Sequence, residues 1–266
     1  MPRLFTLTVL ALLAAPAWAA DFVITRSKHT DAAKVMGRDQ AAQDSTEVTW
    51  MAKDRMRVEE GDRVTIVRTD LKKLFMLDLK AKTYTAVDLP FDMKKYVPAE
   101  LAQMIEPMMA QMKTTVTPTT ETKKVKDWNA TRYTVAMTGP MGASFTQEMW
   151  VTKDVAVDPA ALKAMQETLM SVSMMAAPMA AEMKKLDGLV LVLERTQKVM
   201  GAEIKSKEEV TAIEQKEPAA GLYDLPEGFT EKPFDPMSDP SMKGGMGGMR
   251  GGMGPKGAPP AGGKGG

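Results

Sequence analysis

Residues 46–88 read TEVTWMAKDRMRVEEGDRVTIVRTDLKKLFMLDLKAKTYTAVD, and this stretch indicates the fold more clearly than any other part of the chain. Apolar and polar residues alternate in short runs, which is the two-residue period of a β-strand. The runs are Thr46–Trp50, Arg55–Glu59, Arg63–Arg68, Lys73–Asp78 and Thr83–Asp88. Because the joints between them hold only a few residues, the stretch predicts an up-and-down antiparallel meander rather than βαβ units.

Similar strand-like runs occur on both sides of this meander. Alternation begins upstream at Phe22, and a second set of runs follows downstream. The downstream runs are Val116–Lys124, Thr131–Met137, Ala143–Val151, Leu189–Gln197 and Ala202–Glu214. Leu189 to Leu193 are apolar without alternation, which is typical of a strand that is buried on both faces.

Two methionine-rich segments, Asp92 to Lys113 and Pro159 to Lys185, interrupt the strands. In the first we predict a helix from about Pro98 to Lys113, broken at Pro107, with Met104, Met108 and Met112 on one face. In the second, apolar residues recur at steps of three and four and predict one helix. That stripe comprises Leu162, Met165, Leu169, Val172, Ala176, Met179 and Met183. Methionine is flexible and polarizable, so such surfaces suit hydrophobic partners of variable shape.

The two ends of the chain differ from its middle. Residues 1–19 carry Arg3, an apolar run and Ala17-Trp18-Ala19, the pattern of a signal peptide cleaved after Ala19. Residues 235–266 hold 12 of the 20 glycines, and we predict a disordered tail rich in Gly, Met and Pro. Residues 20–234 between them are enough for one domain.

Composition excludes several classes of protein. Removal of Arg3 with the signal peptide leaves 34 basic and 34 acidic residues, which is not the charge of a nucleic-acid binder. The chain has no cysteine, so disulfides and thiolate metal sites are excluded. The apolar run before Pro16 is too short to span a bilayer, and we expect a protein that is not integral to the membrane.

Residues for catalysis are not apparent in the sequence. His29 is the only histidine and stands in a polar run without a nucleophile elbow elsewhere. Glu59 and Glu60 are adjacent, so their side chains diverge on a strand and cannot form a carboxylate dyad. We therefore expect a protein that is not an enzyme and has no cofactor.

Methionine offers one alternative chemistry, because its thioether can ligate Cu(I). Met246, Met249 and Met253 are spaced by three and four residues in the tail. Met104, Met108 and Met112 form a second set, for which packing or hydrophobic binding is the favoured interpretation.

Several segments in order resemble a known family. They include Trp50–Val58, Ile66–Asp70, Trp128–Tyr133, Glu148–Asp154 and Leu222–Phe229. The succession, over about residues 21–232, resembles a family of exported bacterial proteins built on a domain of unknown function, similar in organisation to the periplasmic lipoprotein-localisation carriers. The resemblance implies a mainly β fold with α inserts: a strongly curved antiparallel sheet, a half-open barrel, with two Met-rich helices on the concave face. It supplies no catalytic residues, and the tail is no part of the carrier pattern.

From these observations we expect an exported periplasmic protein, or a secreted one where there is no outer membrane, that binds a lipid or a lipidated polypeptide in the half-barrel. The expected ligand-binding side chains are Met104, Met108, Met112, Leu162, Met165, Leu169, Met179, Trp50 and Trp150. Two alternatives stay open: a structural or interaction module that contacts an envelope protein, and Met-rich Cu(I) binding. The sequence does not identify the cargo.

Overall fold

The computed structural model describes residues 20–35, 37–139, 144–155, 162–164, 166–167, 181–199 and 202–235. Most of them belong to one 12-stranded sheet of order β14-β8-β7-β6-β5-β4-β1-β13-β12-β11-β10-β9. Its first strands are β1 (Asp21–Thr30), β4 (Gln43–Met51), β5 (Arg55–Glu60), β6 (Arg63–Arg68), β7 (Lys73–Asp78) and β8 (Thr83–Asp88). The remaining ones are β9 (Lys113–Val125), β10 (Trp128–Thr138), β11 (Ser144–Thr152), β12 (Leu189–Val199), β13 (Ala202–Lys216) and β14 (Thr230–Glu231).

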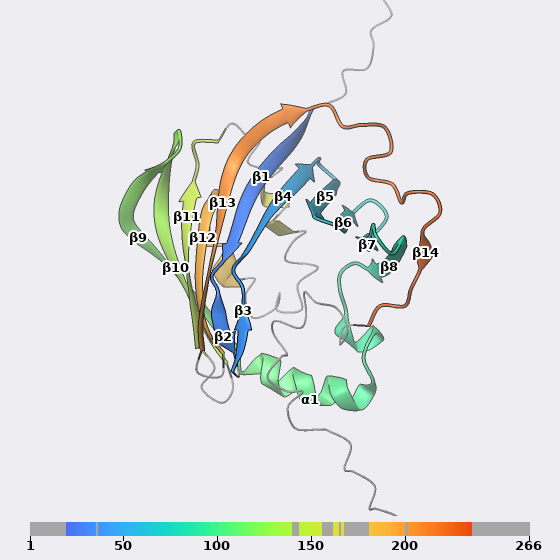
Figure 1. Ribbon diagram of the computed structural model, residues 1–266, viewed down its shortest axis with the longest axis horizontal. Coiled ribbons are helices and arrows are strands. Elements are labelled where there is room, and N and C mark those ends of the chain that lie inside the picture. Colours follow the sequence, from blue (N-terminus) through green and yellow to red (C-terminus); the bar gives the residue numbers. More distant parts are fainter. Residues whose placement is uncertain are drawn as a thin grey trace, which may run out of the picture.

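The sheet curves strongly and is not closed into a barrel (Figure 1). Its two edges are β9 and β14, and every neighbouring pair is antiparallel except β14 with β8. The predicted mainly β fold with a large curved sheet is therefore confirmed. The predicted runs match the strands to within a few residues, since period-two alternation is a local property of the chain.

The first strand, β1, lies in the middle of the sheet. It pairs on one side with β4, where Phe22 faces Met51, and on the other with β13, where Asp21 faces Lys216. β1 thus joins the meander β4–β8 to the strands β9–β13. A separate hairpin of β2 (Ala33–Val35) and β3 (Arg38–Gln40), which the sequence did not indicate, connects β1 to β4.

The first Met-rich segment contains the short 3-10 helix η1 (Met93–Lys95) and the helix α1 (Ala99–Ala110). α1 continues through Pro107, so the predicted break at that residue is wrong. Proline removes one backbone hydrogen bond, and only the last turn of α1 follows it, so little of the helix is lost. In the second segment, residues 162–164, 166–167 and 181–183 are helical, and the rest lies outside the described residues.

Residues paired across the strands point to the same side of the sheet, so register assigns each side chain to a face. On β4–β8 one face carries Met51, Met56, Val67, Leu74 and Val87, and we call it the inner face. The opposite, outer face carries Trp50, Val64, Ile66, Phe75 and Leu77. Residues 217–229 run along the outer side of β5–β8 before β14 (Figure 1).

Candidate functional site

The inner face of β4–β8 is built from three parallel rows of side chains. Adjacent rows are two residues apart along each strand, about 7 Å. The apolar row is Met51, Met56, Val67, Leu74 and Val87, and the middle row is Thr49, Val58, Thr65, Met76 and Thr85. The charged row is Glu47, Glu60, Arg63 and Asp78, and it ends on β8 at the uncharged Thr83. Polarity thus rises in steps across one face of the sheet.

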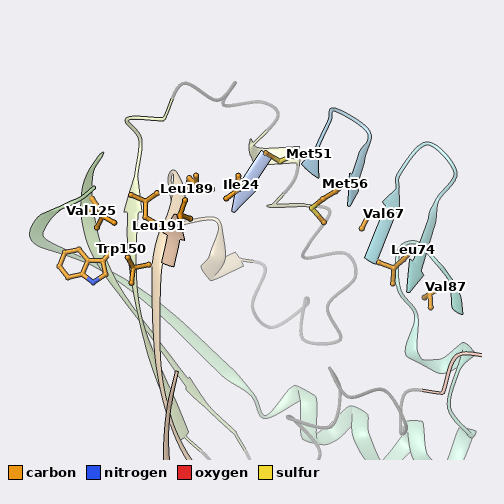
Figure 2. Close-up of a cluster of buried hydrophobic side chains, with 13 residues drawn as sticks. Ile24, Met51, Met56, Val67, Leu74, Val87, Val125, Trp150, Leu189 and Leu191 are labelled. Carbon is orange, nitrogen blue, oxygen red and sulfur yellow. The ribbon is translucent and has the colours of Figure 1, made fainter. Parts of the chain in front are cut away.

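The apolar row belongs to the largest hydrophobic cluster of the described residues. All five of its side chains are buried, and they continue through Ile24, Leu191 and Val210 to the strands on the other side of β1. Figure 2 shows Val125 and Trp150 at one end of this cluster and Val87 at the other. Burial of this row supplies a large share of the hydrophobic stabilisation of the sheet.

The middle row is less enclosed. Val58, Thr65, Met76 and Thr85 are each half-buried, while Thr49 is buried. Val58 and Met76 pack against the first cluster but keep part of their surface outside it.

The charged row continues onto β1, because Glu47 faces Arg26 in the β1–β4 ladder. We call Arg26, Lys28, Glu47 and Glu60 the charged patch. Lys28 Nζ lies 2.8 Å from Glu60 Oε2 and 3.2 Å from Glu47 Oε2, and Arg26 Nη1 lies 3.2 Å from Glu47 Oε1. Ser45 Oγ donates a 2.7 Å hydrogen bond to Glu60 Oε1. Each charge of the patch is thus met by an opposite one.

A shallow hollow of about 500 Å³ adjoins the charged patch. Its walls include Lys28, Thr30, Gln43, Ser45 and Glu60, which are polar residues of β1, β4 and β5. Thr30 faces Gln43 and Lys28 faces Ser45 in the β1–β4 ladder, so these four side chains share the inner face. The inner face therefore ends in a polar recess beyond its charged row.

An aromatic group covers the β8 end of the apolar row. Phe91 stacks on Tyr96 at 5.6 Å between ring centroids, and Phe234 meets both rings edge-on at 5.8 and 5.1 Å. The Tyr96 hydroxyl accepts a 2.9 Å hydrogen bond from the backbone N–H of Asp88. All three rings pack against the first cluster. The local sequence pattern did not indicate this group, because Tyr96 and Phe234 are 138 residues apart in the chain.

Both described ends of the second Met-rich segment contact hydrophobic clusters. Leu162 packs against the first cluster, and the Gln166 side chain donates a 3.1 Å hydrogen bond to the carbonyl of Gly188. At the other end, Met183 packs against a second cluster on β9–β12, which includes Val135 and Met149. Glu182 Oε2 accepts a 2.8 Å hydrogen bond from the Val116 N–H, so this end is fixed to the edge strand β9.

The second cluster lies on the same face as the charged patch. Lys28 faces Glu208 of β13, Glu208 faces Leu193 of β12, and Leu193 faces Met149 of β11. Met112 packs against this cluster as well. Apolar clusters therefore lie on two sides of the charged patch.

The outer face of β4–β8 is covered by the chain itself. Leu222, Tyr223, Leu225 and Phe229 pack against its cluster of Val64, Ile66 and Leu77. Arg57 Nη1 donates a 3.0 Å hydrogen bond to the Leu222 carbonyl, and Arg68 Nη1 lies 3.1 Å from Asp224 Oδ1.

A buried hydrogen bond ties this cover to the first strand. The Tyr223 hydroxyl donates to Asp21 Oδ2 at 2.6 Å, and both residues are buried. Burial, followed by this hydrogen bond, raises the pKa of Tyr223. The guanidinium of Arg55 lies 5.4 Å from the Tyr223 ring centroid. The cover is therefore held by polar as well as apolar contacts.

The two predicted tryptophans lie in different clusters. Trp50 is partly buried and packs against the outer-face cluster beneath the Leu222–Phe229 cover. Trp150 is buried in the first cluster, with Lys123 Nζ 3.8 Å from its ring centroid, and its indole N–H has no partner in the described structure. Sequence period alone cannot decide between faces when both are apolar, and this is why the two were predicted together.

The predicted methionines and leucines are only partly covered by the structure. Met112 and Leu162 pack against the second and first clusters respectively. Met104 and Met108 belong to α1, but their side chains lie outside the described residues. Met165, Leu169 and Met179 also lie outside them, as do residues 1–19 and 236–266.

His29 has carboxylates at both of its ring nitrogens. Nδ1 lies 2.7 Å from Asp44 Oδ1 and Nε2 lies 3.1 Å from Asp31 Oδ1. The hydrogen bond with Asp44 is the main cause that raises the pKa of His29. Among the residues that the structure describes, no group of three or more His, Asp or Glu side chains is arranged to hold a metal ion. The described helices include none that is long and apolar enough to cross a membrane.

This architecture defines a mainly antiparallel β protein with one open, curved sheet. The chain belongs to the family "Domain of unknown function (DUF4412)", whose model matches residues 35–229. The expected membership of a family built on a domain of unknown function is thereby confirmed. No curated protein matches the sequence.

One solved structure similar to the chain is described as a "putative outer membrane lipoprotein-sorting protein domain from Vibrio parahaemolyticus". The match covers 77% of this chain and 89% of that chain, with 7% sequence identity and a TM-score of 0.29. Agreement of this size does not define a ligand.

Proposed function

We propose that the chain is an exported, periplasmic, non-enzymatic protein that binds a hydrophobic ligand, a lipid or a lipidated polypeptide, on the inner face of its curved sheet. The observation that carries this proposal is the middle row, where half-buried Val58 and Met76 adjoin a buried apolar row. Apolar side chains that stay partly accessible beside a buried row offer a ligand surface, while the buried row remains in the core.

The Met-rich segments support the same placement. Leu162 packs against the first cluster, and Met112 and Met183 pack against the second. We propose that the two segments lie over the inner face as Met-rich helices and contribute side chains to the ligand site. Methionine suits this role because its side chain adapts to acyl chains of different length.

The non-enzymatic part of the proposal rests on the surroundings of His29. Its ring nitrogens are engaged by Asp44 and Asp31 at an exposed strand end, away from the apolar rows. A histidine held in this way is favoured as an imidazolium and is a poor general base.

A fluorescent hydrophobe tests the site. We would titrate N-phenyl-1-naphthylamine, whose emission rises in apolar surroundings, into the mature protein and into Met76→Gln. We expect saturable binding by the mature protein and roughly tenfold weaker binding by Met76→Gln, since one buried apolar contact is lost. Leu79→Gln is the matched control, because Leu79 is an exposed apolar residue on the turn after β7. Equal affinities in all three proteins would contradict the placement.

Residues outside the described part provide a second test. Replacement of Met165 and Leu169 by Gln is predicted to abolish lipid binding while the sheet stays folded. Native mass spectrometry of the protein purified from its own envelope would identify a bound lipid directly. A bound copper mass that disappears with residues 235–266, or a ligand-free protein to which no lipid binds, would support the metal or the interaction alternative instead.

A further inference from the structure

The inner face changes from apolar to charged over a short distance. From Met51 in the apolar row to Glu47 in the charged row is four residues along β4, or about 13 Å. The same order holds on β5, from Met56 through Val58 to Glu60, and on β1, from Phe22 through Ile24 to Arg26. An amphiphile laid along the strands would meet apolar groups at one end and charges at the other.

The charged patch is partly shielded from solvent. The side chains of Arg26, Lys28 and Glu47 are 18%, 25% and 16% exposed, and that of Glu60 is 38% exposed. Burial alone would lower the pKa of Lys28, but its hydrogen bond to Glu60 and the charges of Glu47 and Glu60 outweigh this effect and raise it. Burial would likewise raise the pKa of Glu60, but its hydrogen bonds from Lys28 and Ser45 outweigh this effect and lower it.

The sum of charges over the patch is zero, since Arg26 and Lys28 oppose Glu47 and Glu60. An anionic headgroup would be attracted by the two cations and repelled by two carboxylates within the same few ångströms. A zwitterionic headgroup presents both signs. Its ammonium can donate to Glu47 or Glu60, and its phosphate can accept from Arg26 or Lys28, so every charge stays compensated.

We propose that the charged patch and the adjoining hollow hold the headgroup of a zwitterionic amphiphile, whose acyl chains lie along the middle row, against the half-buried Val58 and Met76. This inference rests on the proposed function and names the class of its ligand. The hollow supplies the space, and Ser45, Gln43 and Thr30 supply neutral polar groups for the rest of the headgroup. Asp44 also lines the hollow, and its Oδ1 lies 2.7 Å from His29 Nδ1.

Calorimetry with two soluble short-chain lipids tests the inference. Phosphatidylethanolamine and phosphatidylglycerol with identical acyl chains differ only in the headgroup, which is zwitterionic in the first and anionic in the second. We expect the mature protein to bind phosphatidylethanolamine roughly tenfold more tightly. Equal affinities, or a preference for phosphatidylglycerol, would overturn the assignment.

Two variants make the test specific for the patch. Glu60→Gln leaves the patch with one excess positive charge and is expected to shift the preference to phosphatidylglycerol. Lys28→Met leaves one excess negative charge and should weaken phosphatidylglycerol further. Lys80→Met, on the turn after β7, is the control and should leave the ratio of affinities unchanged. An unchanged ratio in both patch variants would contradict the inference.

The failure of this inference can be told apart from that of the proposed function. N-phenyl-1-naphthylamine has no charged headgroup and should bind Glu60→Gln as it binds the unchanged protein. Binding of the probe without headgroup preference would overturn the inference and leave the proposed function standing. Absence of binding for the probe and both lipids would overturn both.

Discussion

Alternate residues of the same five strands form the inner and outer faces of β4–β8, but the two faces differ in the groups that surround their apolar side chains. On the outer face, Leu222 to Phe229 cover the apolar side chains and are fixed by the Tyr223–Asp21 hydrogen bond. On the inner face, polarity rises from the apolar row to the charged patch, and Val58 and Met76 stay half-buried between them. Both faces thus contribute buried apolar side chains to the core, but a segment of the chain packs over the outer face, whereas the inner face grades into charged residues.

Neighbouring leucines on β7 separate the two roles. Leu74 belongs to the inner face and Leu77 to the outer face, and both are buried. Leu77→Ala and Leu74→Ala should each lower the free energy of unfolding by about 2–5 kcal/mol, which urea denaturation measures. Only Leu74→Ala should also weaken binding of N-phenyl-1-naphthylamine by the folded protein. Equal loss of binding in Leu77→Ala would break the distinction between the faces.

The polar anchor of the outer cover can be removed without changing its apolar part. Tyr223→Phe leaves the carboxylate of Asp21 buried without its donor and should cost about 1–3 kcal/mol of stability. Tyr84→Phe is the matched control, because the 3.1 Å hydrogen bond from Tyr84 to Glu231 is exposed. This control should change stability by less than about 0.5 kcal/mol. Similar values for both variants, in thermal or chemical unfolding, would show that the Asp21 contact does not anchor the cover.

The smallest expected effect is the pH dependence of stability caused by His29 on β1. Its side chain points to the face opposite that of Lys28. His29 is surrounded by Asp44, Asp31 and the facing Lys207. Its folded-state pKa is raised above 6.5, so the charged form stabilises the fold. That contribution is complete below about pH 6.5 and is lost as the pH rises through the folded-state pKa.

Unfolding of the unchanged protein and of His29→Gln, measured from about pH 6 to pH 9, checks this direction. The difference in stability between them should shrink with increasing pH. A difference that stays constant or grows would contradict the raised pKa.

Local pattern predicted most of the strands, because alternation in runs such as Arg63–Arg68 is set by neighbouring residues. It could not assign the faces of Leu74-Phe75-Met76-Leu77, where four successive residues are apolar and both sides of the strand are buried or half-buried. The faces of the tryptophans were equally undetermined, and Trp50 and Trp150 were both predicted as ligand-binding side chains, although the two belong to different clusters.

Contacts between distant segments were beyond such reasoning as well. The stacking of Phe91 on Tyr96 under Phe234, the pairing of β14 with β8, and the Tyr223–Asp21 hydrogen bond depend on the completed sheet. The charged patch had a local signal, since Arg26, Lys28, Glu47 and Glu60 each occupy a regular strand position. Only the register of the strands shows that these four residues lie together on one face.

The central position of β1 has a consequence for how the chain reaches its fold. A chain synthesised from its amino end holds residues 21–30 from the start, but their partners on β13 are 206–216. The two halves of the sheet can join only after almost the whole domain has emerged, and contacts of such long sequence separation slow folding. During that interval only the β4 side of β1 can be paired, because residues 43–51 follow β1 closely in the chain while residues 206–216 do not.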